Sequence, residues 1–117
     1  MQEEKYLFKK RIKIIKESMD LISGKWKLPI LCALLNNQNM RFSDLQNELQ
    51  NIGPKMLSKE LQDLEINQLI KKVTSDKKPY IVNYQPTLLA YNLFPIINNM
   101  SSWNLNYKST ICQNFNK

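Results

Sequence analysis

The amino-acid sequence predicts a mainly helical fold with one small β-hairpin in its second half. Apolar residues recur at helical spacing along most of the chain, whereas the period shortens to two only near residues 70–85. With 117 residues, of which 43% are hydrophobic, the chain has the size of one globular domain. We therefore expect a single domain over residues 1–117.

The first two predicted helices differ in how much apolar surface they carry. The first, about residues 8–22, is amphipathic, because its apolar residues form one stripe: Phe8, Ile12, Ile15, Met19 and Ile22. Gly24 ends this pattern, and the segment from Trp26 to Leu35 is apolar nearly all round, as expected for a helix at the centre of a core. Pro29 fits such a helix only near its first turn. Cys32 lies in the same segment, so we expect a buried, unreactive thiol.

Two further helices are predicted around a tight turn, over about residues 43–68. Ser43 can cap the first of them, with Phe42, Leu45 and Leu49 facing inward. Gly53 is a permissive N-cap and Pro54 suits the first position of the next helix. In that helix, Leu57, Leu61 and Leu64 step by four and three and define the buried face. The opposite face carries polar side chains, namely Lys55, Ser58, Lys59 and Gln62.

A hairpin and a long helix complete the chain. Ile70 and Val73 flank two lysines, residues 75–79 form a turn, and Tyr80, Val82 and Tyr84 alternate, which predicts two antiparallel strands over about 70–85. The last helix is expected over about 88–107, with Thr87 as its cap. Pro95 lies inside this pattern and should kink the helix by freeing the carbonyl of Tyr91.

A short helix, a tight turn, a second helix and a basic hairpin, in this order, predict a winged helix-turn-helix. In that fold the second helix enters the major groove of duplex DNA, which is about 12 Å wide. Lysine and glutamine side chains there can reach guanine, adenine or phosphates, and lysines at the hairpin tip can contact phosphates. The candidate DNA-binding residues are Ser43, Lys55, Met56, Ser58, Lys59, Gln62, Lys77 and Lys78.

The net charge of +7 agrees with a nucleic-acid partner, but composition alone allows a second interpretation, in which the charge merely aids solubility. Likewise, a polar helix face is often ordinary solvated surface. The turn containing Gly53 and Pro54, the short helix before it and the basic hairpin after it favour DNA binding.

The composition argues against several other functions. The chain has no His, and its two Cys are eighty positions apart, so neither a cofactor nor a metal site nor a His-based catalytic pair is predicted. The candidate carboxylates, Asp44, Glu48, Asp63 and Glu65, have no metal or base partner and read as surface charge. We therefore expect that this protein is not an enzyme. Cys112 lies in the exposed tail, and no apolar signal or membrane-spanning run is seen, which predicts a cytoplasmic protein without a membrane partner.

Five segments, in this order and spacing, also resemble the HxlR-type transcriptional regulators. They are Ile22–Trp26, Arg41–Leu45, Ile52–Ser58, Leu61–Glu65 and Pro79–Tyr84, and the resemblance extends from about residue 12 to Trp103. It implies a dimeric winged-helix DNA-binding protein, with the helix from Pro54 reading DNA and the first and last helices forming the dimer interface. The residues of this dimer interface would be Phe8, Ile12, Ile15, Leu93, Ile96, Met100, Trp103 and Tyr107.

The chain departs from the family pattern at three positions. Some members sense oxidants through a Cys at the position of Lys13, so the resemblance implies no such switch here. Gln68 replaces a common Gly in the turn after the recognition helix, where a left-handed conformation costs a non-Gly residue about 1–2 kcal/mol, unless Asn67 takes that role. Ala90 replaces a common Gly and should stiffen the last helix slightly.

Together these observations predict a sequence-specific DNA-binding transcriptional regulator that acts as a homodimer on a two-fold symmetric operator. Repression is favoured because a chain this small has little spare surface to recruit polymerase. The alternative is a winged-helix module for protein–protein contact, against which Lys55 and Lys59 argue. The sequence does not indicate the operator sequence or a small-molecule effector.

Overall fold

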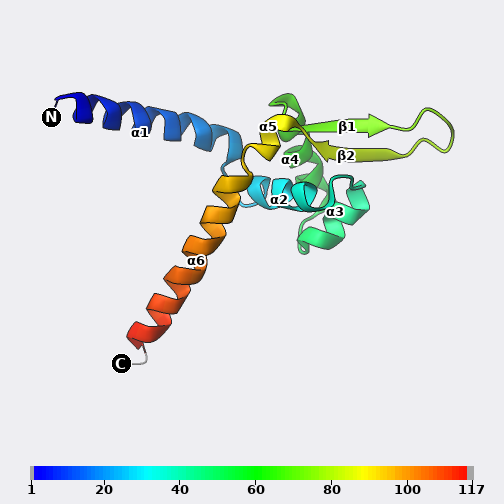
Figure 1. Ribbon diagram of the computed structural model, residues 1–117. Helices are drawn as coiled ribbons and strands as arrows, with labels where there is room; N and C mark the ends of the chain where they lie inside the picture. Colours follow the sequence, from blue (N-terminus) through cyan, green and yellow to red (C-terminus); the bar gives the residue numbers. More distant parts are fainter. Residues whose placement is uncertain (1, 116–117) are drawn as a thin grey trace.

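The computed structural model describes residues 2–115 and has the mainly helical architecture predicted, with one antiparallel hairpin (Figure 1). In chain order the elements are α1 (Gln2–Ile22), α2 (Lys27–Asn37), α3 (Phe42–Leu49), α4 (Pro54–Ile66), β1 (Ile70–Thr74), β2 (Val82–Pro86), α5 (Leu88–Tyr91) and α6 (Phe94–Phe115). The helix-turn-helix is formed by α3 and α4, and the wing is formed by β1 and β2.

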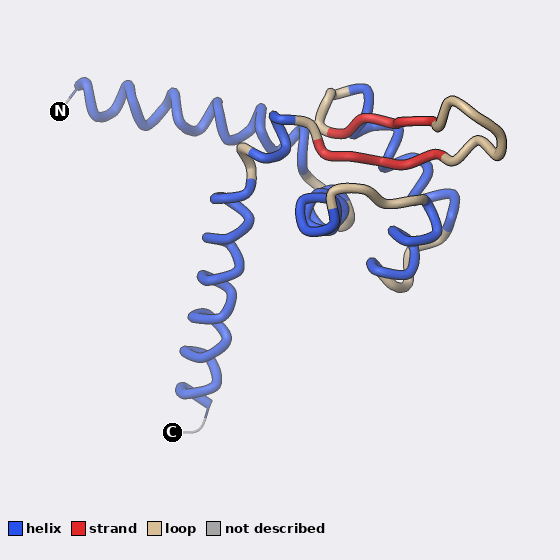
Figure 2. The backbone as a smooth tube through the Cα atoms, turned by 45° about the vertical axis from the view of Figure 1, so that its right-hand side comes forward, coloured by secondary structure: helices blue, strands red, loops and turns tan. Residues whose placement is uncertain are grey.

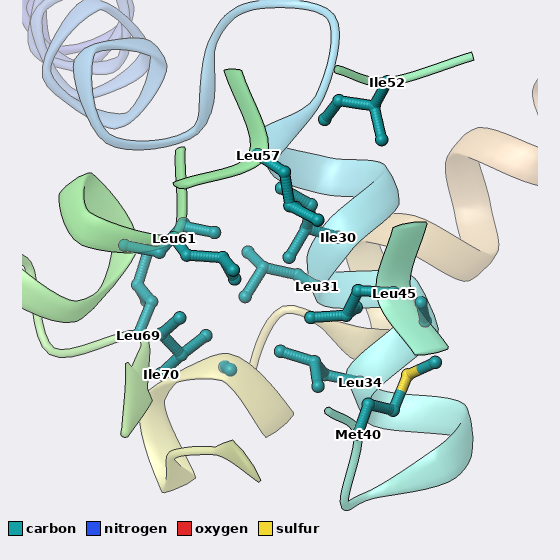
Figure 3. Close-up of a cluster of buried hydrophobic side chains, with 13 residues drawn as sticks. Ile30, Leu31, Leu34, Met40, Leu45, Ile52, Leu57, Leu61, Leu69 and Ile70 are labelled. Carbon is teal, nitrogen blue, oxygen red and sulfur yellow. The ribbon is translucent and has the colours of Figure 1, made fainter. Parts of the chain in front are cut away.

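Helix α2 is the centre of the core, as its apolar composition predicts. Ile30, Leu31 and Leu34 have no exposed surface. Side chains from α3, α4 and the hairpin pack around them, among them Leu45 and Leu57 (Figure 3). Burying a side chain of this size contributes about 1.5–3 kcal/mol, so this cluster holds the helix-turn-helix and the wing together.

The turn between α3 and α4 fixes the start of the recognition helix. Gln50 and Asn51 both have positive φ, at 54° and 59°, which reverses the chain. Gly53 then adopts an extended conformation as the N-cap, Pro54 occupies the first turn, and the Leu57 N–H donates to the Gly53 carbonyl at 3.0 Å. The predicted start of this helix is confirmed.

The predicted cap of α3 is wrong. Helix α3 begins at Phe42, two residues earlier than a cap at Ser43 would place it, so Ser43 lies inside the first turn and is exposed. The Asp44 carboxylate instead accepts a hydrogen bond from the Arg41 N–H at 3.0 Å. A carboxylate here also interacts favourably with the positive end of the helix dipole, which a hydroxyl does not.

The hairpin pairs β1 and β2 in antiparallel register, with Ile70 opposite Pro86 and Lys72 opposite Tyr84. Met40, just before α3, adds an isolated bridge to Tyr84. The second strand starts at Val82, later than the alternation from Tyr80 suggested, and Tyr80 is 59% exposed. The wing loop ends only when the Ser75 N–H donates to the Ile81 carbonyl at 2.9 Å, which leaves Tyr80 outside the ladder.

The turn after α4 has the strained backbone that was expected at Gln68. Gln68 has φ of 60°, in the left-handed region, whereas the alternative residue, Asn67, has φ of −85°. Thr87, predicted to cap the last helix with its hydroxyl, donates that hydroxyl to the Gln68 carbonyl at 2.7 Å instead. Thr87 therefore ties the start of α5 to this turn.

The expected kinked C-terminal helix is two helices. Helix α5 ends at Tyr91 and α6 begins at Phe94, so Pro95 lies in the first turn of α6. Because a proline inside a helix lacks an N–H and clashes with the carbonyl four residues earlier, ending one helix and starting another is the less costly solution. The α6 helix also extends past residue 107, to Phe115.

Helices α1 and α6 project from the body, away from the hairpin (Figures 1 and 2). No residue of α1 is buried. The radius of gyration is 18.0 Å, whereas a compact chain of this length has about 13 Å. The chain exposes 9432 Å², whereas a folded monomer of 13.9 kDa exposes about 6,700 Å². Most of the apolar surface of the two outer helices is therefore left uncovered by the described part of their own chain.

Candidate nucleic-acid interface

The solvent face of α4 is polar, as predicted. Leu57, Leu61 and Leu64 are at most 2% exposed and anchor the helix on the core. Because a helix repeats every 3.6 residues, the positions between them point outward. The outward side chains Lys55, Ser58, Lys59 and Gln62 are all exposed, and Met56 beside them is 43% exposed.

Two acidic residues of α4 are held on the flank that faces the start of α2. The Lys27 ammonium donates to the Glu60 carboxylate, Nζ to Oε2, at 2.7 Å and lies 3.6 Å from Asp63 Oδ2. The side chains of Lys27 and Glu60 are only 14% and 12% exposed. The hydrogen bond to Glu60 is the main reason why the pKa of Lys27 is raised. The Glu60 charge is thereby neutralised on this flank, away from the outward lysines of α4, and the Asp63 charge is offset in part.

The overall positive charge is not concentrated on the helix-turn-helix and wing. Residues 41–86 contain seven basic and six acidic side chains, whereas residues 5–16, within α1, contain six basic side chains and no acidic one. The separation of charge on α4 itself, and not the net charge of the chain, makes its outward face basic.

The wing loop holds Lys77 and Lys78 at the far end of the hairpin, and both are exposed. The Ser75 hydroxyl organises this loop: it accepts the Ile81 N–H at 2.8 Å and lies within donating distance of the Lys77 and Pro79 carbonyls. The loop backbone is therefore fixed by one side chain, while the lysine side chains stay free to contact a partner.

The residues expected at a dimer interface lie elsewhere, on the outer helices. Those on α1 and α6 are 43% to 64% exposed: Phe8, Ile12, Ile15, Ile96, Met100, Trp103 and Tyr107. Trp103 stacks on Tyr107 with ring centroids 5.3 Å apart. Leu93 differs, because it is half-buried and packs against the core of its own chain.

The expected burial of Cys32 is wrong. Its thiol is exposed, as is that of Cys112, whose exposure the sequence predicted. Cys32 lies on the side of α2 from which α6 leaves the body, and it lines a hollow of about 500 Å³ together with Pro29, Leu49 and Phe94. Periodicity could not reveal this, because α2 is apolar on every side.

Within residues 2–115, no group of three His, Cys, Asp or Glu side chains is placed to hold a metal ion. None of the helices described there is both long enough and apolar enough to span a bilayer.

The chain matches a known protein family over most of its length. A model of the HxlR-like helix-turn-helix family matches residues 21–111, from the end of α1 to the last turns of α6. The chain belongs to the HxlR-like helix-turn-helix family. The match includes the helix-turn-helix, the wing and most of α6, so the resemblance noted in the sequence is confirmed.

Relatives in this family are described as transcriptional regulators. The chain is 33% identical over 101 residues to the HTH-type regulator BH0655 of Halalkalibacterium halodurans, covering 82% of this chain and 89% of the relative. It is 31% identical to the HTH-type regulator YtcD of Bacillus subtilis, over 80% of this chain and 73% of the relative. The HxlR-like chain is a transcriptional regulator with a helix-turn-helix DNA-binding domain.

Solved structures support the same fold. A crystal structure of the regulator ytcD superposes with a TM-score of 0.77 at 28% identity, covering 81% of this chain and 96% of that one. A MarR-family regulator from Enterococcus faecalis V583 reaches 0.76 at 23% identity, over 86% and 91%. The second likeness concerns the fold alone. The winged-helix architecture of this HxlR-like protein is therefore shared across regulators of low sequence identity.

Proposed function

We propose that this HxlR-like protein is a sequence-specific DNA-binding repressor that acts as a homodimer. The observation that carries the proposal is the outward face of α4, where Lys55, Ser58, Lys59 and Gln62 are exposed while Glu60 is tied to Lys27 on the flank of the helix. A surface of hydrogen-bond donors from which the Glu60 carboxylate is withdrawn is complementary to the acceptors of DNA.

The dimensions of α4 fit the major groove. A helix with its side chains is about 10–12 Å across and the groove of B-DNA is about 12 Å wide, so one helix fills it. In that position lysine side chains can donate to guanine and Gln62 can bond adenine in a bidentate manner. Met56 offers an apolar surface of the kind that contacts the thymine methyl group. These side chains would give the protein its sequence preference.

Phosphate contacts would fix the register of the protein on DNA. Lys77 and Lys78 extend from the wing loop, and Ser43 is exposed at the start of α3. Each phosphate that a lysine neutralises releases condensed counterions and steepens the fall of affinity with salt by about 0.9 in a log–log plot. Binding is therefore expected to weaken strongly between low and physiological salt.

The homodimer is supported by the apolar surface of α1 and α6. The chain exposes 9432 Å², roughly 2,800 Å² more than a folded monomer of its mass. Each chain of an obligate homodimer buries about 1,000–2,500 Å², so pairing of the outer helices accounts for an excess of this order. A two-fold dimer would place two α4 helices about 34–36 Å apart, one turn of DNA.

Repression is the favoured direction of regulation. The surfaces of the chain are assigned to the core, to DNA and to the second copy, and this leaves little area to recruit polymerase. A repressor needs only to occupy its operator.

The DNA-binding proposal is tested by fluorescence anisotropy of a labelled duplex from the upstream region of the protein's own gene. The wild type should bind it more tightly than a random duplex, and the triple variant Lys55→Ala/Lys59→Ala/Gln62→Ala should lose that preference. The control triple variant Lys9→Ala/Lys13→Ala/Gln113→Ala removes the same side chains from the outer helices. If wild type and the α4 variant bind both duplexes weakly and alike, the DNA proposal is wrong and protein–protein contact takes its place.

The homodimer is tested separately by sedimentation equilibrium. Met100→Asp on α6 should convert the dimer to a monomer, because it places a charge in an apolar contact. Met56→Asp is the matched control, since Met56 and Met100 are 43% and 50% exposed but lie on different surfaces. A wild type that sediments as a monomer at all micromolar concentrations would contradict the proposal.

A further inference from the structure

A small polar hollow lies between the recognition helix and the wing. It has a volume of about 160 Å³ and is lined by Ser58, Leu61, Gln62, Glu65, Lys72 and Tyr84. Two of these residues, Lys72 and Tyr84, come from the hairpin and were not among the candidate DNA-binding residues. The hollow thus brings together side chains more than ten residues apart in the chain.

The backbone explains why Lys72, and not Lys71, reaches this place. Side chains alternate between the two faces of a strand. Ile70 is buried against the core, so Lys72 lies on that same face, directly opposite Tyr84 in the register. Tyr84 packs against the core as well. Lys71 points to the other face and does not line the hollow.

Helix α4 contributes the other wall. Ser58, Gln62 and Glu65 are spaced by four and three residues, which places them along one side of the helix. This side is distinct from the flank where Glu60 meets Lys27. The outward face of α4 is therefore bordered by a neutralised ion pair on one flank and by this hollow on the other.

The chemistry of the hollow fits an anion. The Lys72 ammonium has three N–H donors, and the hydroxyls of Ser58 and Tyr84 and the Gln62 amide can each donate. In the described part of the chain the ion pairs are those of Lys27, so no carboxylate holds the Lys72 ammonium. Glu65 is the opposing group, because its carboxylate repels an anion.

The position of the hollow identifies the anion. A helix of about 10–12 Å in a groove of about 12 Å has the two phosphate backbones along its flanks and the base edges in front of it. With α4 in the groove, a hollow on its flank, closed by the wing, would face a phosphate and not a base.

We propose that the hollow between α4 and the hairpin binds one phosphate of the DNA backbone, held by Lys72 together with the Ser58 and Tyr84 hydroxyls. The proposal rests on the DNA-binding function proposed above and deepens it. Glu65 weakens this contact, so that affinity at the site is the balance of one cation and one carboxylate. The contact fixes the angle between wing and recognition helix on DNA without reading sequence.

The test compares Lys72→Ala, Glu65→Gln and the matched control Lys71→Ala by anisotropy, on the upstream duplex and on a random duplex, across a salt series. Lys72→Ala should weaken binding to both duplexes by the same factor, about threefold to tenfold, and make the log–log salt slope shallower by about 0.9. Glu65→Gln should tighten binding to both about twofold to threefold. Lys71→Ala should bind like the wild type.

Each outcome is decisive. If Lys72→Ala and Lys71→Ala behave alike while the wild type binds tightly, the phosphate site is wrong and the DNA-binding function stands. If Lys72→Ala changes only the preference between duplexes, Lys72 reads a base and the proposal is overturned. A wild type without affinity for either duplex overturns both proposals. If Lys72→Ala melts at a lower temperature than the wild type, Lys72→Gln, which keeps part of the packed stem, replaces it in every comparison.

Discussion

Replacing Lys27 with Met tests whether the ion pair on the flank of α4 holds the recognition helix in place. The substitution keeps an unbranched apolar stem but leaves the Glu60 carboxylate, with a side chain only 12% exposed, without its 2.7 Å donor. Removing one partner of a fully buried pair costs about 3–5 kcal/mol, and an exposed pair is worth about 0–1 kcal/mol. Because water still reaches part of both side chains, we expect a loss of about 2 kcal/mol.

The assay is thermal and urea unfolding at one fixed protein concentration. With an unfolding entropy of about 2.1 cal/mol/K per residue, 2 kcal/mol corresponds to roughly 8 °C in Tm for 117 residues. Lys25→Met is the control, because Lys25 is exposed and its Nζ lies over the Trp26 ring at 5.1 Å, a contact worth about 0.5–1 kcal/mol. The double variant Lys27→Met/Glu60→Met should recover most of the loss, because it removes the unpaired charge.

The pH dependence of the same difference provides a second check. The pKa of Lys27 is raised above its ordinary value of 10.5, chiefly by the hydrogen bond to Glu60 and despite its partial burial. A group with a higher pKa in the folded state stabilises that state below its unfolded pKa and loses the effect as pH rises through its folded pKa. The gap between wild type and Lys27→Met should stay constant from about pH 7 to 10 and shrink above it. Equal stability of the two proteins at pH 7 would refute the role assigned to Lys27.

Three further substitutions test the backbone and core by urea unfolding at fixed concentration. Gln68→Gly should stabilise the protein by about 0.5–1 kcal/mol, because φ of 60° strains Gln; a loss of stability would mean that the Gln68 side chain makes a contact of its own. Gly24→Ala should destabilise it by about 1–2 kcal/mol, since φ is 97° there, and an unchanged midpoint would show that the α1–α2 junction relaxes. Leu34→Ala, at 0% exposure, should cost about 2–5 kcal/mol; a cost below 1 kcal/mol would place the core elsewhere.

The periodic parts of the fold could be predicted because burial leaves a pattern in the sequence. Leu57, Leu61 and Leu64 repeat at the spacing of one helix face, and the exposed face of α4 follows from them. Gly53 and Pro54 mark a helix start because Gly is accepted at the N-cap and the fixed φ of Pro suits the first helical position, where its missing N–H costs little. The strained turn at Gln68 was anticipated from the family resemblance, because the family pattern usually has Gly at that position.

Other features depended on tertiary contacts that no local pattern carries. Lys27 and Glu60 are 33 residues apart, and either could have been a solvated surface charge. The exposure of Cys32 depends on where α6 leaves the body, and the place of Lys72 depends on how the hairpin lies against α4. Pro95 was correctly seen as incompatible with a helix interior, but spacing alone could not distinguish a kink from two helices.

Helix α1 extends over 21 residues without burying any of them in its own chain. Nucleation of an isolated helix is costly, and most helical stability in proteins comes from packing of an apolar face. In the proposed homodimer, the ordering of α1 should therefore depend on the second copy. The free energy of association would offset the entropy cost of ordering this helix. If the proposed homodimer forms, dilution would unfold α1 first, and circular dichroism at successive concentrations would record the concentration at which this happens.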